Sequence, residues 1–263
     1  MRNILKTFAM TVIIVSLLFI TACDERTTKE KDPGPGHQPP ALSNTPDIVV
    51  EIDFSLLEAS ELTIDYQGNQ VKAITLPDLI DLEEIAELYS YQIVGADGFS
   101  PRTASQGGYD LVWDDFATGY LIKTDSTSYR TYYPAFSEVG NNGFNVKNPA
   151  IFNLYRSIIV EKIDGESVVF ELNILDVVQV DEQDAYRLQD LITPYVSDTP
   201  AENEYFFVDH TGDFAREPIS WAMMTDGVFI IETGRTFFPN FNEGWNRFRN
   251  LQKIYISGPD TDI

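Results

Sequence analysis

Four arginines offer the clearest chemistry in this sequence, because a guanidinium binds carboxylate or phosphate through two parallel hydrogen bonds. Two of them follow a glycine by four residues, and the other two each precede an aromatic, strand-like stretch. They are Arg102, Arg216, Arg130 and Arg235. The functional interpretation is an anion or carboxylate clamp. The structural alternative is that each arginine pairs with a nearby acid or satisfies loop carbonyls.

One histidine lies among acids in a threonine- and glycine-rich segment. His210 follows Asp209 and precedes Asp213 and Glu217. A serine–histidine hydrolase would have to use His210, but the sequence lacks the G-x-S-x-G signature of many such enzymes. The acids are spaced oxygen ligands of a kind that Ca²⁺ accepts, although the spacing does not match an EF-hand loop and Arg216 lies among them. We expect a solvated turn, no catalytic residue and no metal site.

The only cysteine stands where a lipid anchor would be attached. An apolar run from Phe8 to Ile20 follows positive charge, and small residues directly precede Cys23. This pattern resembles the lipobox of bacterial lipoproteins, in which the cysteine receives a diacylglyceryl group and cleavage occurs just before it. The run is too short to span a bilayer comfortably. We expect residues 1–22 to be a signal peptide and a lipid on Cys23 to hold the protein at the cell envelope, outside the cytoplasm.

The charge and cysteine content of the chain limit the kinds of partner and chemistry that it can have. The chain has 41 acidic residues against 18 lysines and arginines, a formal net charge of −23. Such a surface repels phosphate backbones, so we expect no nucleic acid partner. Cationic partners are compatible with this charge, but solubility alone explains it. Once Cys23 carries lipid, no cysteine remains for a disulfide, a thiolate nucleophile or a metal ligand.

The segment after the cysteine cannot form a core. Residues 24–46 are charged and then rich in proline and glycine, so we expect a disordered tether over 23–46. Beyond Asp47, β-branched and aromatic runs predict strands at 48–52, 91–94 and 158–160 and hairpins at 62–76 and 120–133. An apolar spacing over 77–88 predicts a helix.

The second half of the chain repeats the first. The matched pairs, in the same order along both halves, are Asp78-Leu79-Ile80 with Asp190-Leu191-Ile192, Gly98 with Gly212, Gly119 with Gly227, 130–136 with 235–241, and Asn153 with Asn250. A repeat period of about 100 residues predicts tandem domains rather than a solenoid. We expect an α+β fold class, with two β-rich mixed α/β domains at 47–163 and 164–258 and a tail at 259–263. The alternative is one continuous domain with chance similarities.

The stretch Gly95-Ala96-Asp97-Gly98-Phe99-Ser100-Pro101-Arg102 is the most diagnostic of a family. It follows the strand-like run 91–94, and Leu76-Pro77-Asp78-Leu79 precedes that run. With Ser157–Val160 as a closing strand, these segments resemble the oxidoreductase molybdopterin-binding domain, the fold of sulfite oxidase, over roughly 71–161. Residues 168–256 match less well. The resemblance implies that fold for both copies and a pterin-type cofactor near Asp97 and Arg102.

The chain differs from this family at the residues that bind the metal and the cofactor. Its enzymes ligate molybdenum through a cysteine thiolate, and no cysteine follows Cys23. These enzymes also surround the pterin phosphate with basic and histidine residues. Here both copies are acidic, and together they contain a single histidine, His210. Fold does not imply function, so we expect the fold without its catalysis. Molybdopterin enters by resemblance only, and we expect no cofactor.

These observations favour a membrane-anchored, non-catalytic module that binds a small ligand or an envelope protein. The candidate ligand-binding residues are Asp97, Gly98, Arg102, Arg130, His210, Arg216 and Arg235. One alternative is a molybdopterin-binding oxidoreductase or redox accessory protein. Another is a structural subunit of an envelope complex.

Overall fold

The structure is a computed structural model that describes residues 45–82, 85–101, 110–138, 143–196, 199–241 and 248–258. Cys23, the signal segment 1–22, Arg102, the tail 259–263 and nearly all of the tether lie outside these residues. The predictions made for them stay predictions. Below, the first half means residues 47–163 and the second half means residues 164–258.

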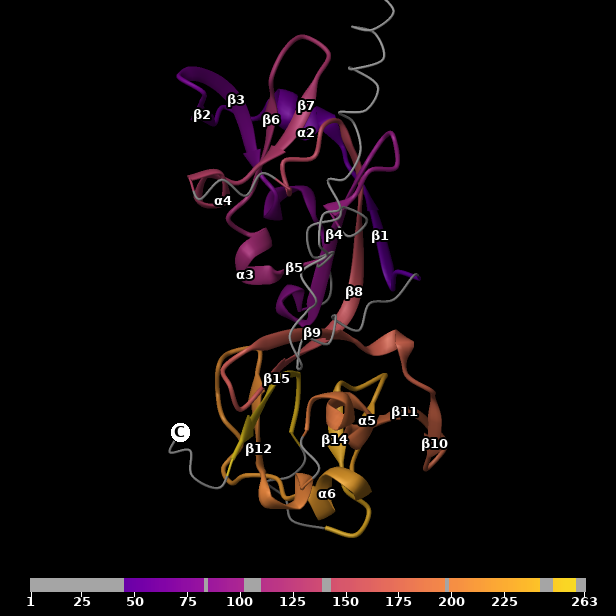
Figure 1. The fold of residues 1–263 in the computed structure, drawn as a ribbon. Helices are drawn as coiled ribbons and strands as arrows, with labels where there is room; N and C mark the ends of the chain where they lie inside the picture. The colour runs from indigo at the N-terminus through magenta and orange to yellow at the C-terminus, as the bar shows by residue number, and fades with distance from the viewer. Residues whose placement is uncertain are drawn as a thin grey trace, which may run out of the picture. The chain divides into compact units, whose positions relative to one another are not determined.

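Short strands and short helical turns make up both halves (Figure 1). The first half contains β1 (Ile48–Glu51), α2 (Phe54–Ala59), β2 (Thr63–Tyr66), β3 (Asn69–Thr75), η1 (Pro77–Leu79), η2 (Ala86–Leu88), β4 (Tyr89–Gly95), β5 (Leu111–Val112), α3 (Trp113–Phe116), β6 (Tyr120–Lys123), β7 (Tyr129–Tyr132), α4 (Pro134–Glu138) and β8 (Pro149–Glu161). The second contains β9 (Ser167–Glu171), η4 (Leu172–Ile174), β10 (Val178–Val180), β11 (Gln183–Arg187), α5 (Leu188–Ile192), η5 (Thr193–Tyr195), η6 (Pro200–Glu202), β12 (Glu204–Asp209), α6 (Trp221–Asp226), β13 (Val228–Ile230), β14 (Arg235–Phe237) and β15 (Leu251–Ser257). The architecture is α+β and β-rich, as the sequence predicts.

The long strand β8 pairs with strands of both halves (Figure 1). Its first part pairs antiparallel with β4 and β1, and its last part pairs antiparallel with β9 and parallel with β15. Alternate side chains of a strand point to one face. On β8 these are Phe152 and Leu154, buried in the first-half core, and Ile158 and Val160, buried in the second-half core. One strand therefore contributes to both cores, and the predicted strand 158–160 is its end.

Each half also has a four-stranded antiparallel sheet, and the two sheets have the same strand order. The first runs β2-β3-β6-β7 and the second β10-β11-β13-β14. Each begins with a hairpin whose two turn residues, Gln67-Gly68 or Asp181-Glu182, have positive φ, as a type I′ turn requires. Counted from matched residues, the first hairpin is longer at its tip by two pairs, which include Tyr66↔Asn69. The hairpins predicted at 62–76 and 120–133 are confirmed.

The matched glycines of the repeat have the same kind of neighbour. A Cβ added to Gly119 would lie 2.5 Å from Cε1 of Tyr133, which is fully buried. A Cβ added to Gly227 would meet the ring of Phe238 in the same way. Because an aromatic ring packs directly on the backbone, both positions require glycine.

A buried tyrosine also recurs at one position of the framework. Tyr91 and Tyr205 each donate a hydrogen bond to the carbonyl five residues earlier, at 2.8 and 2.9 Å. Their rings pack on Trp113 and Trp221, with centroid separations of 5.7 and 5.9 Å. The repeated segments of the sequence thus occupy matching places in the two halves.

The predicted helix at 77–88 is wrong. The described residues there form two 3₁₀ turns, η1 and η2, and both Ile80 and Ile85 have extended backbone angles. Leu79 and Leu88 are buried in the first-half core. The apolar spacing therefore reflects an irregular segment that turns its leucines inward, because tertiary burial produces the same spacing as a helix here.

The sequence match of Asn153 with Asn250 is also corrected. Asn250 has a φ of 51°, precedes β15 and accepts a hydrogen bond at its carbonyl from the N–H of His210. In the first half Asn148 has a φ of 46°, precedes β8 and accepts in the same way from Ala96. Asn153 lies within β8, so Asn148 is the counterpart of Asn250.

Apolar side chains form two large buried clusters, one within 52–154 and the other within 158–256. The described residues nevertheless fall within one compact unit. The domain boundary expected at Asp164-Gly165 stays a prediction. None of the described helices has the length and apolar character needed to cross a bilayer.

Candidate functional site

The candidate site lies on the four-stranded sheet of the second half. Tyr186 and Phe229 point from one face of this sheet into the second-half core. Ala185, Val228 and Ile230 form a separate cluster on the opposite face, with Val178, Val180 and Phe237 packed around it. We call this opposite face, in either half, the far face of the sheet.

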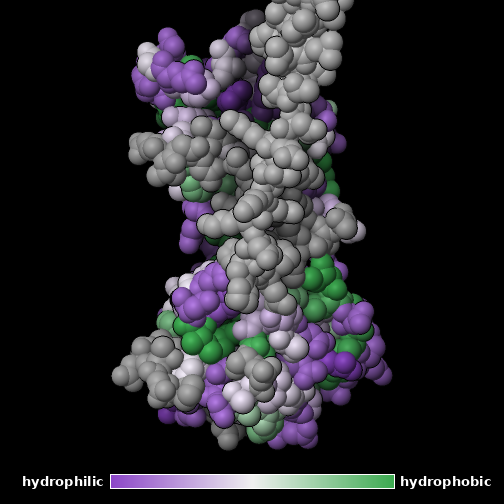
Figure 2. All heavy atoms as spheres, in the orientation of Figure 1, coloured by the Kyte–Doolittle hydropathy of each residue, from purple (hydrophilic) through white to green (hydrophobic). Residues whose placement is uncertain are grey.

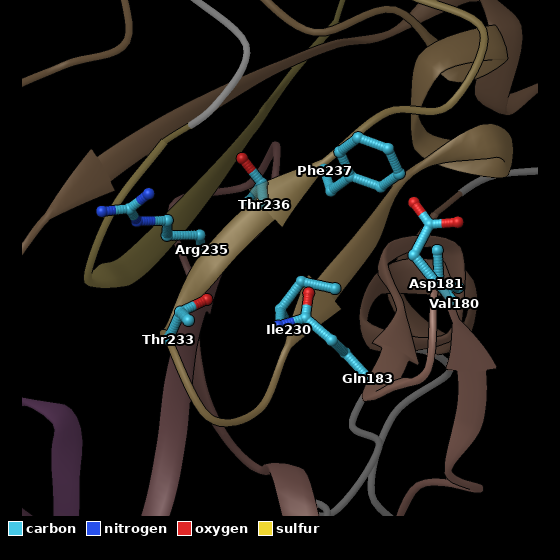
Figure 3. Close-up of a pocket in the computed structure, with 8 residues that line it drawn as sticks. All are labelled: Val180, Asp181, Gln183, Ile230, Thr233, Arg235, Thr236 and Phe237. Carbon is cyan, nitrogen blue, oxygen red and sulfur yellow. The ribbon is translucent and has the colours of Figure 1, made fainter.

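A pocket of about 280 Å³ opens on the far face of the second half (Figure 3). Val180, Ile230 and Phe237 supply apolar surface, and the polar residues around it are Asp181, Gln183, Thr233, Arg235 and Thr236. Arg235 and Asp181 lie at opposite ends of the group in Figure 3. The volume is just below the roughly 300–1,000 Å³ typical of ligand sites. An apolar surface beside a guanidinium suits a small molecule with an apolar body and an anionic group.

The first half closes the matching face with tyrosines. Tyr66, Ala73, Ile122 and Tyr132 share the far face of its sheet by strand register. The rings of Tyr66 and Tyr132 meet edge to face with centroids 5.1 Å apart, and Ala73 and Ile122 are fully buried. Tyr66 belongs to one of the two residue pairs by which the first hairpin is longer than the second. The shorter second hairpin has no counterpart of Tyr66, so its far face stays open.

A second hollow of about 690 Å³ lies between the hairpin tips of the first half, but its cations are already engaged. Lys123 forms an ion pair with Glu58 at 2.5 Å, and Lys72 donates a hydrogen bond to the Glu58 carbonyl. The hydrogen bond from Lys123 holds the pKa of Glu58 below its usual value. Because Val71 is the single aliphatic residue among its lining residues, this groove is the weaker ligand site.

Exposed apolar side chains do not gather into a broad interface on the face drawn in Figure 2. Hydrophilic residues cover much of the described surface there, and apolar residues form small groups. The large apolar side chains that are well exposed include Ile174, Val177 and Phe214. The ring of Phe214 is stacked on Tyr255 with centroids 5.7 Å apart. On the face drawn in Figure 2, the described residues therefore form no broad apolar docking face.

Two of the predicted arginines occupy matching strands. Arg130 lies on β7 and is half-buried, whereas Arg235 lies on β14, is exposed and lines the pocket. Each faces another cation across an antiparallel bridge, Lys147 for Arg130 and Arg249 for Arg235. Sequence reasoning missed Lys147 and Arg249. The signal was present, since each stands directly before the asparagine that precedes the last strand of its half.

The turn after β4 carries Asp97 and Gly98, and Gly95 at its start lies against the backbone of Lys147. Gly98 has a φ of 81°, and Oδ1 of Asp97 accepts a hydrogen bond from the N–H of Phe99 at 3.0 Å. A Cβ on Gly95, at the start of this turn, would lie 3.2 Å from the Lys147 carbonyl oxygen. Asp97 is exposed, and its hydrogen bond with Phe99 stabilises the turn.

In the matching turn after β12, Asp209 performs the same structural task. Its Oδ1 accepts hydrogen bonds from both the N–H and the hydroxyl of Thr211 and from the N–H of Asp213, at 2.7–3.0 Å. Burial opposes its ionisation, but these hydrogen bonds outweigh burial and lower the pKa of Asp209. No group of three or more acidic, histidine or cysteine side chains among the described residues is arranged to hold a metal ion. Oδ1 of Asp209 is therefore engaged within its own turn, and the solvated-turn interpretation stays a prediction.

His210 and Arg216 do not join the pocket, because the residues that line it lie on other elements. The N–H of His210 donates to the Asn250 carbonyl, and Nδ1 is buried with no hydrogen-bond partner among the described residues. Arg216 is exposed.

A buried polar network in the first half was also missed from the sequence. Gln92 on β4 donates from Nε2 to Ser100 at 3.0 Å, and its Oε1 accepts from Asn153 at 2.7 Å and from Tyr155 at 2.9 Å. Nearby, Ser90 donates to the fully buried Glu171 at 3.3 Å. Ser100 follows Asp97 by three residues, so the network fixes the turn after β4 to the sheet.

The second half lacks this network. Counting from the matched bulges at Val94/Gly95 and Val208/Asp209, the position of Gln92 corresponds to Phe206. Glutamine is therefore not required by the framework at this position. The network is specific to the first half, where it positions the turn that carries Asp97 and Gly98.

The described donor set does not fit the cofactor that the family resemblance implies. That family holds molybdenum through a thiolate, and residues 45–258 contain no cysteine. Oxygen and nitrogen donors alone are poor substitutes for a soft thiolate ligand. Asp97 lies exposed with its oxygen bonded to its own turn.

Comparison with known proteins found no match: no family model, curated protein or solved structure resembles this chain significantly.

Proposed function

We propose that this protein is a lipid-anchored envelope protein that binds a small amphipathic anion on the far face of its second half and catalyses no reaction. The observation that carries the proposal is the pocket with Val180, Ile230 and Phe237 on its apolar side and Arg235 at its edge. The matching face of the first half is closed by the contact between Tyr66 and Tyr132. The framework therefore does not require an open face.

The ligand chemistry follows from the lining. Apolar contact favours a ring or short alkyl body, because removing it from water is favourable. Among the described residues, Arg235 makes no ion pair, and its guanidinium suits a carboxylate. Asp181 at the opposite end disfavours a second negative charge on the ligand. A small aryl or alkyl monocarboxylate matches this arrangement.

Binding is tested with phenylacetate by saturation-transfer NMR. Val180→Trp places an indole at the pocket, so it should abolish the signal. The matched control is Ile64→Trp, at the corresponding hairpin position of the first half, beside the hollow that is not the proposed site. It should leave the signal intact. If Val180→Trp folds and binds phenylacetate as the unsubstituted protein does, the proposal is overturned.

The anchor is supported by the apolar run and small residues before Cys23. Two or more acyl chains hold a protein on a membrane stably, whereas one chain binds marginally. Cell fractionation of a Cys23→Ser variant should find the protein released or unprocessed. A variant that stays membrane-bound at mature size would contradict the anchor.

We also infer the sulfite-oxidase-like fold for both halves, without its catalysis. Support comes from the strand β4 that leads into the turn at Asp97-Gly98 and from the matching turn after β12. Superposition of an experimental structure on that fold tests the inference. A different strand order in the superposed core would contradict it.

A further inference from the structure

We propose that the chain carries two matching anion sites, one in each half, which together bind a flexible polymer bearing repeated oxyanion groups. The sites are the cation pairs Arg130–Lys147 and Arg235–Arg249. This inference goes beyond the proposed pocket, because the first pair lies outside it.

The first pair is held together by backbone geometry. The N–H of Thr131 donates to the Val146 carbonyl at 3.0 Å, and the N–H of Asn148 donates to the Tyr129 carbonyl at 2.8 Å. These two hydrogen bonds flank the bridge between Arg130 and Lys147. The two residues therefore form a non-hydrogen-bonded antiparallel pair, the arrangement in which opposite side chains come closest.

The second half reproduces this geometry. The N–H of Thr236 donates to the Phe248 carbonyl, and the N–H of Asn250 donates to the Gly234 carbonyl, both at 2.9 Å. They flank the bridge between Arg235 and Arg249 in the same way. Two cations thus face each other at the same place in both halves.

Such a pair needs an explanation, because like charges directly opposite each other on a sheet repel. The chain has 41 acidic residues that could neutralise them. Ion pairs within the described ranges include Lys123–Glu58, Lys162–Glu166 and Lys253–Glu161, and none of these contains any of the four cations. The first half uses lysine where the second uses arginine, so the charge recurs although the side chain differs. An external anion resolves the repulsion in both halves.

The surface around the pairs indicates what kind of anion binds. Lys147, Arg235 and Arg249 are exposed, and Arg130 is half-buried. Cations on open surface recognise charged groups more than molecular shape, which suits a flexible polymer over a compact ligand. Once the polymer is bound at one cation pair, its binding at the second pair is intramolecular. The overall affinity for the polymer is therefore higher than the affinity of either pair alone. At about 0.1 M salt the repulsion from distant acids is screened beyond about 10 Å, while contacts at the pairs persist.

The test is calorimetric titration at about 0.1 M salt, where the Debye length is about 10 Å. The probes are polygalacturonate, which repeats carboxylates, and polyphosphate, which repeats phosphates, with galacturonate and inorganic phosphate as single units. The variants are Arg130→Ala/Lys147→Ala and Arg235→Ala/Arg249→Ala. The control, Lys162→Ala/Lys253→Ala, removes the same charge at two lysines that already pair with acids. Melting curves confirm that each variant is folded.

The proposal expects at least one polymer to bind far more tightly than its single unit. Each pair variant should lose roughly tenfold or more in polymer affinity, because bivalent enhancements span about 10²–10⁴-fold. The control should change by less than about twofold, since distant charges are screened. The polymer that binds identifies carboxylate or phosphate as the source of the oxyanion.

Three results would overturn it: binding of neither polymer, an equal loss in the control, or unchanged affinity after removal of either pair. Arg235 also lines the pocket, so the first-half variant separates the two proposals. Arg130→Ala/Lys147→Ala should lose polymer binding and keep phenylacetate binding. Loss of phenylacetate binding in Val180→Trp with intact polymer binding would support both.

Discussion

Replacing Gly119 with alanine tests the framework that the two halves share. The new methyl would lie 2.5 and 2.6 Å from Cε1 and Cζ of Tyr133 and 2.7 Å from Cδ1 of Leu76. Each separation is about 1 Å shorter than the usual 3.5–4.0 Å between carbons. Tyr133 and Leu76 are both fully buried, so neither can move into solvent.

The expected cost follows from these contacts. Overpacking a core costs typically about 1–3 kcal/mol, and rigid, buried neighbours place Gly119→Ala at the upper end. Gly119 lies outside the left-handed region, so alanine recovers about 0.4–1 kcal/mol by restricting the unfolded chain. The net loss should be about 2 kcal/mol, which lowers the melting temperature by roughly 4–8 °C for a chain of this size.

Urea denaturation measures this loss directly. Gly227→Ala should lose a similar amount, because the Phe238 ring packs on Gly227 in the same way. Combining Gly119→Ala with Tyr133→Leu removes the ring that the methyl strikes, so the double variant should lose less than the two single losses added together. Unchanged stability in Gly119→Ala, or strictly additive losses, would refute the reasoning.

Three further predictions concern single side chains. Tyr133→Phe should raise stability by about 1 kcal/mol, measured by urea denaturation, because the buried hydroxyl has no hydrogen-bond partner among the described residues; a loss would show that the hydroxyl is satisfied. Gln92→Leu should cost at least about 1–3 kcal/mol on the same assay, since it leaves buried polar partners unpaired; a neutral change would remove the network from the account. Asp209→Asn should lower stability at neutral pH. The folded state lowers the pKa of Asp209 below its ordinary 3.8, so its contribution is fully present above 3.8 and disappears as the pH falls through the folded value. Melting temperatures should therefore converge with those of the unsubstituted protein in strong acid, and a constant difference across pH would contradict the linkage.

Local patterns predicted the strands and hairpins well. The runs at 62–76 and 120–133 alternate or carry β-branched and aromatic residues around turn residues, and local sequence decides such hairpins. The helix predicted at 77–88 failed because Leu79 and Leu88 are buried by tertiary packing, which imposes an apolar spacing without a helix.

Arg235 is the one predicted residue that lines the candidate pocket. Arg130 and Arg235 were singled out because they belong to the repeated motif. Their partners Lys147 and Arg249 were missed. Which residue lies opposite each arginine depends on how a later segment of the chain pairs with the strand, and local sequence does not show that pairing. Aligning Asn148 rather than Asn153 with Asn250 would have revealed the cation before each asparagine.

The pocket itself was not predictable from motifs. It exists because the β10–β11 hairpin is shorter at its tip than β2–β3 and lacks a counterpart of Tyr66. An absent side chain leaves no pattern in the sequence, so the open face appears only when the strand registers of both halves are known.

The central claim is that the open far face of the second half binds the ligand and the closed face of the first half does not. Methyl NMR during a phenylacetate titration tests this most directly, because Val180 and Ile230 report on one face and Ile64 and Ile122 on the other. We expect saturable shifts at Val180 and Ile230, with Ile64 and Ile122 unchanged. Equal shifts on both faces, or shifts confined to the first half, would contradict it.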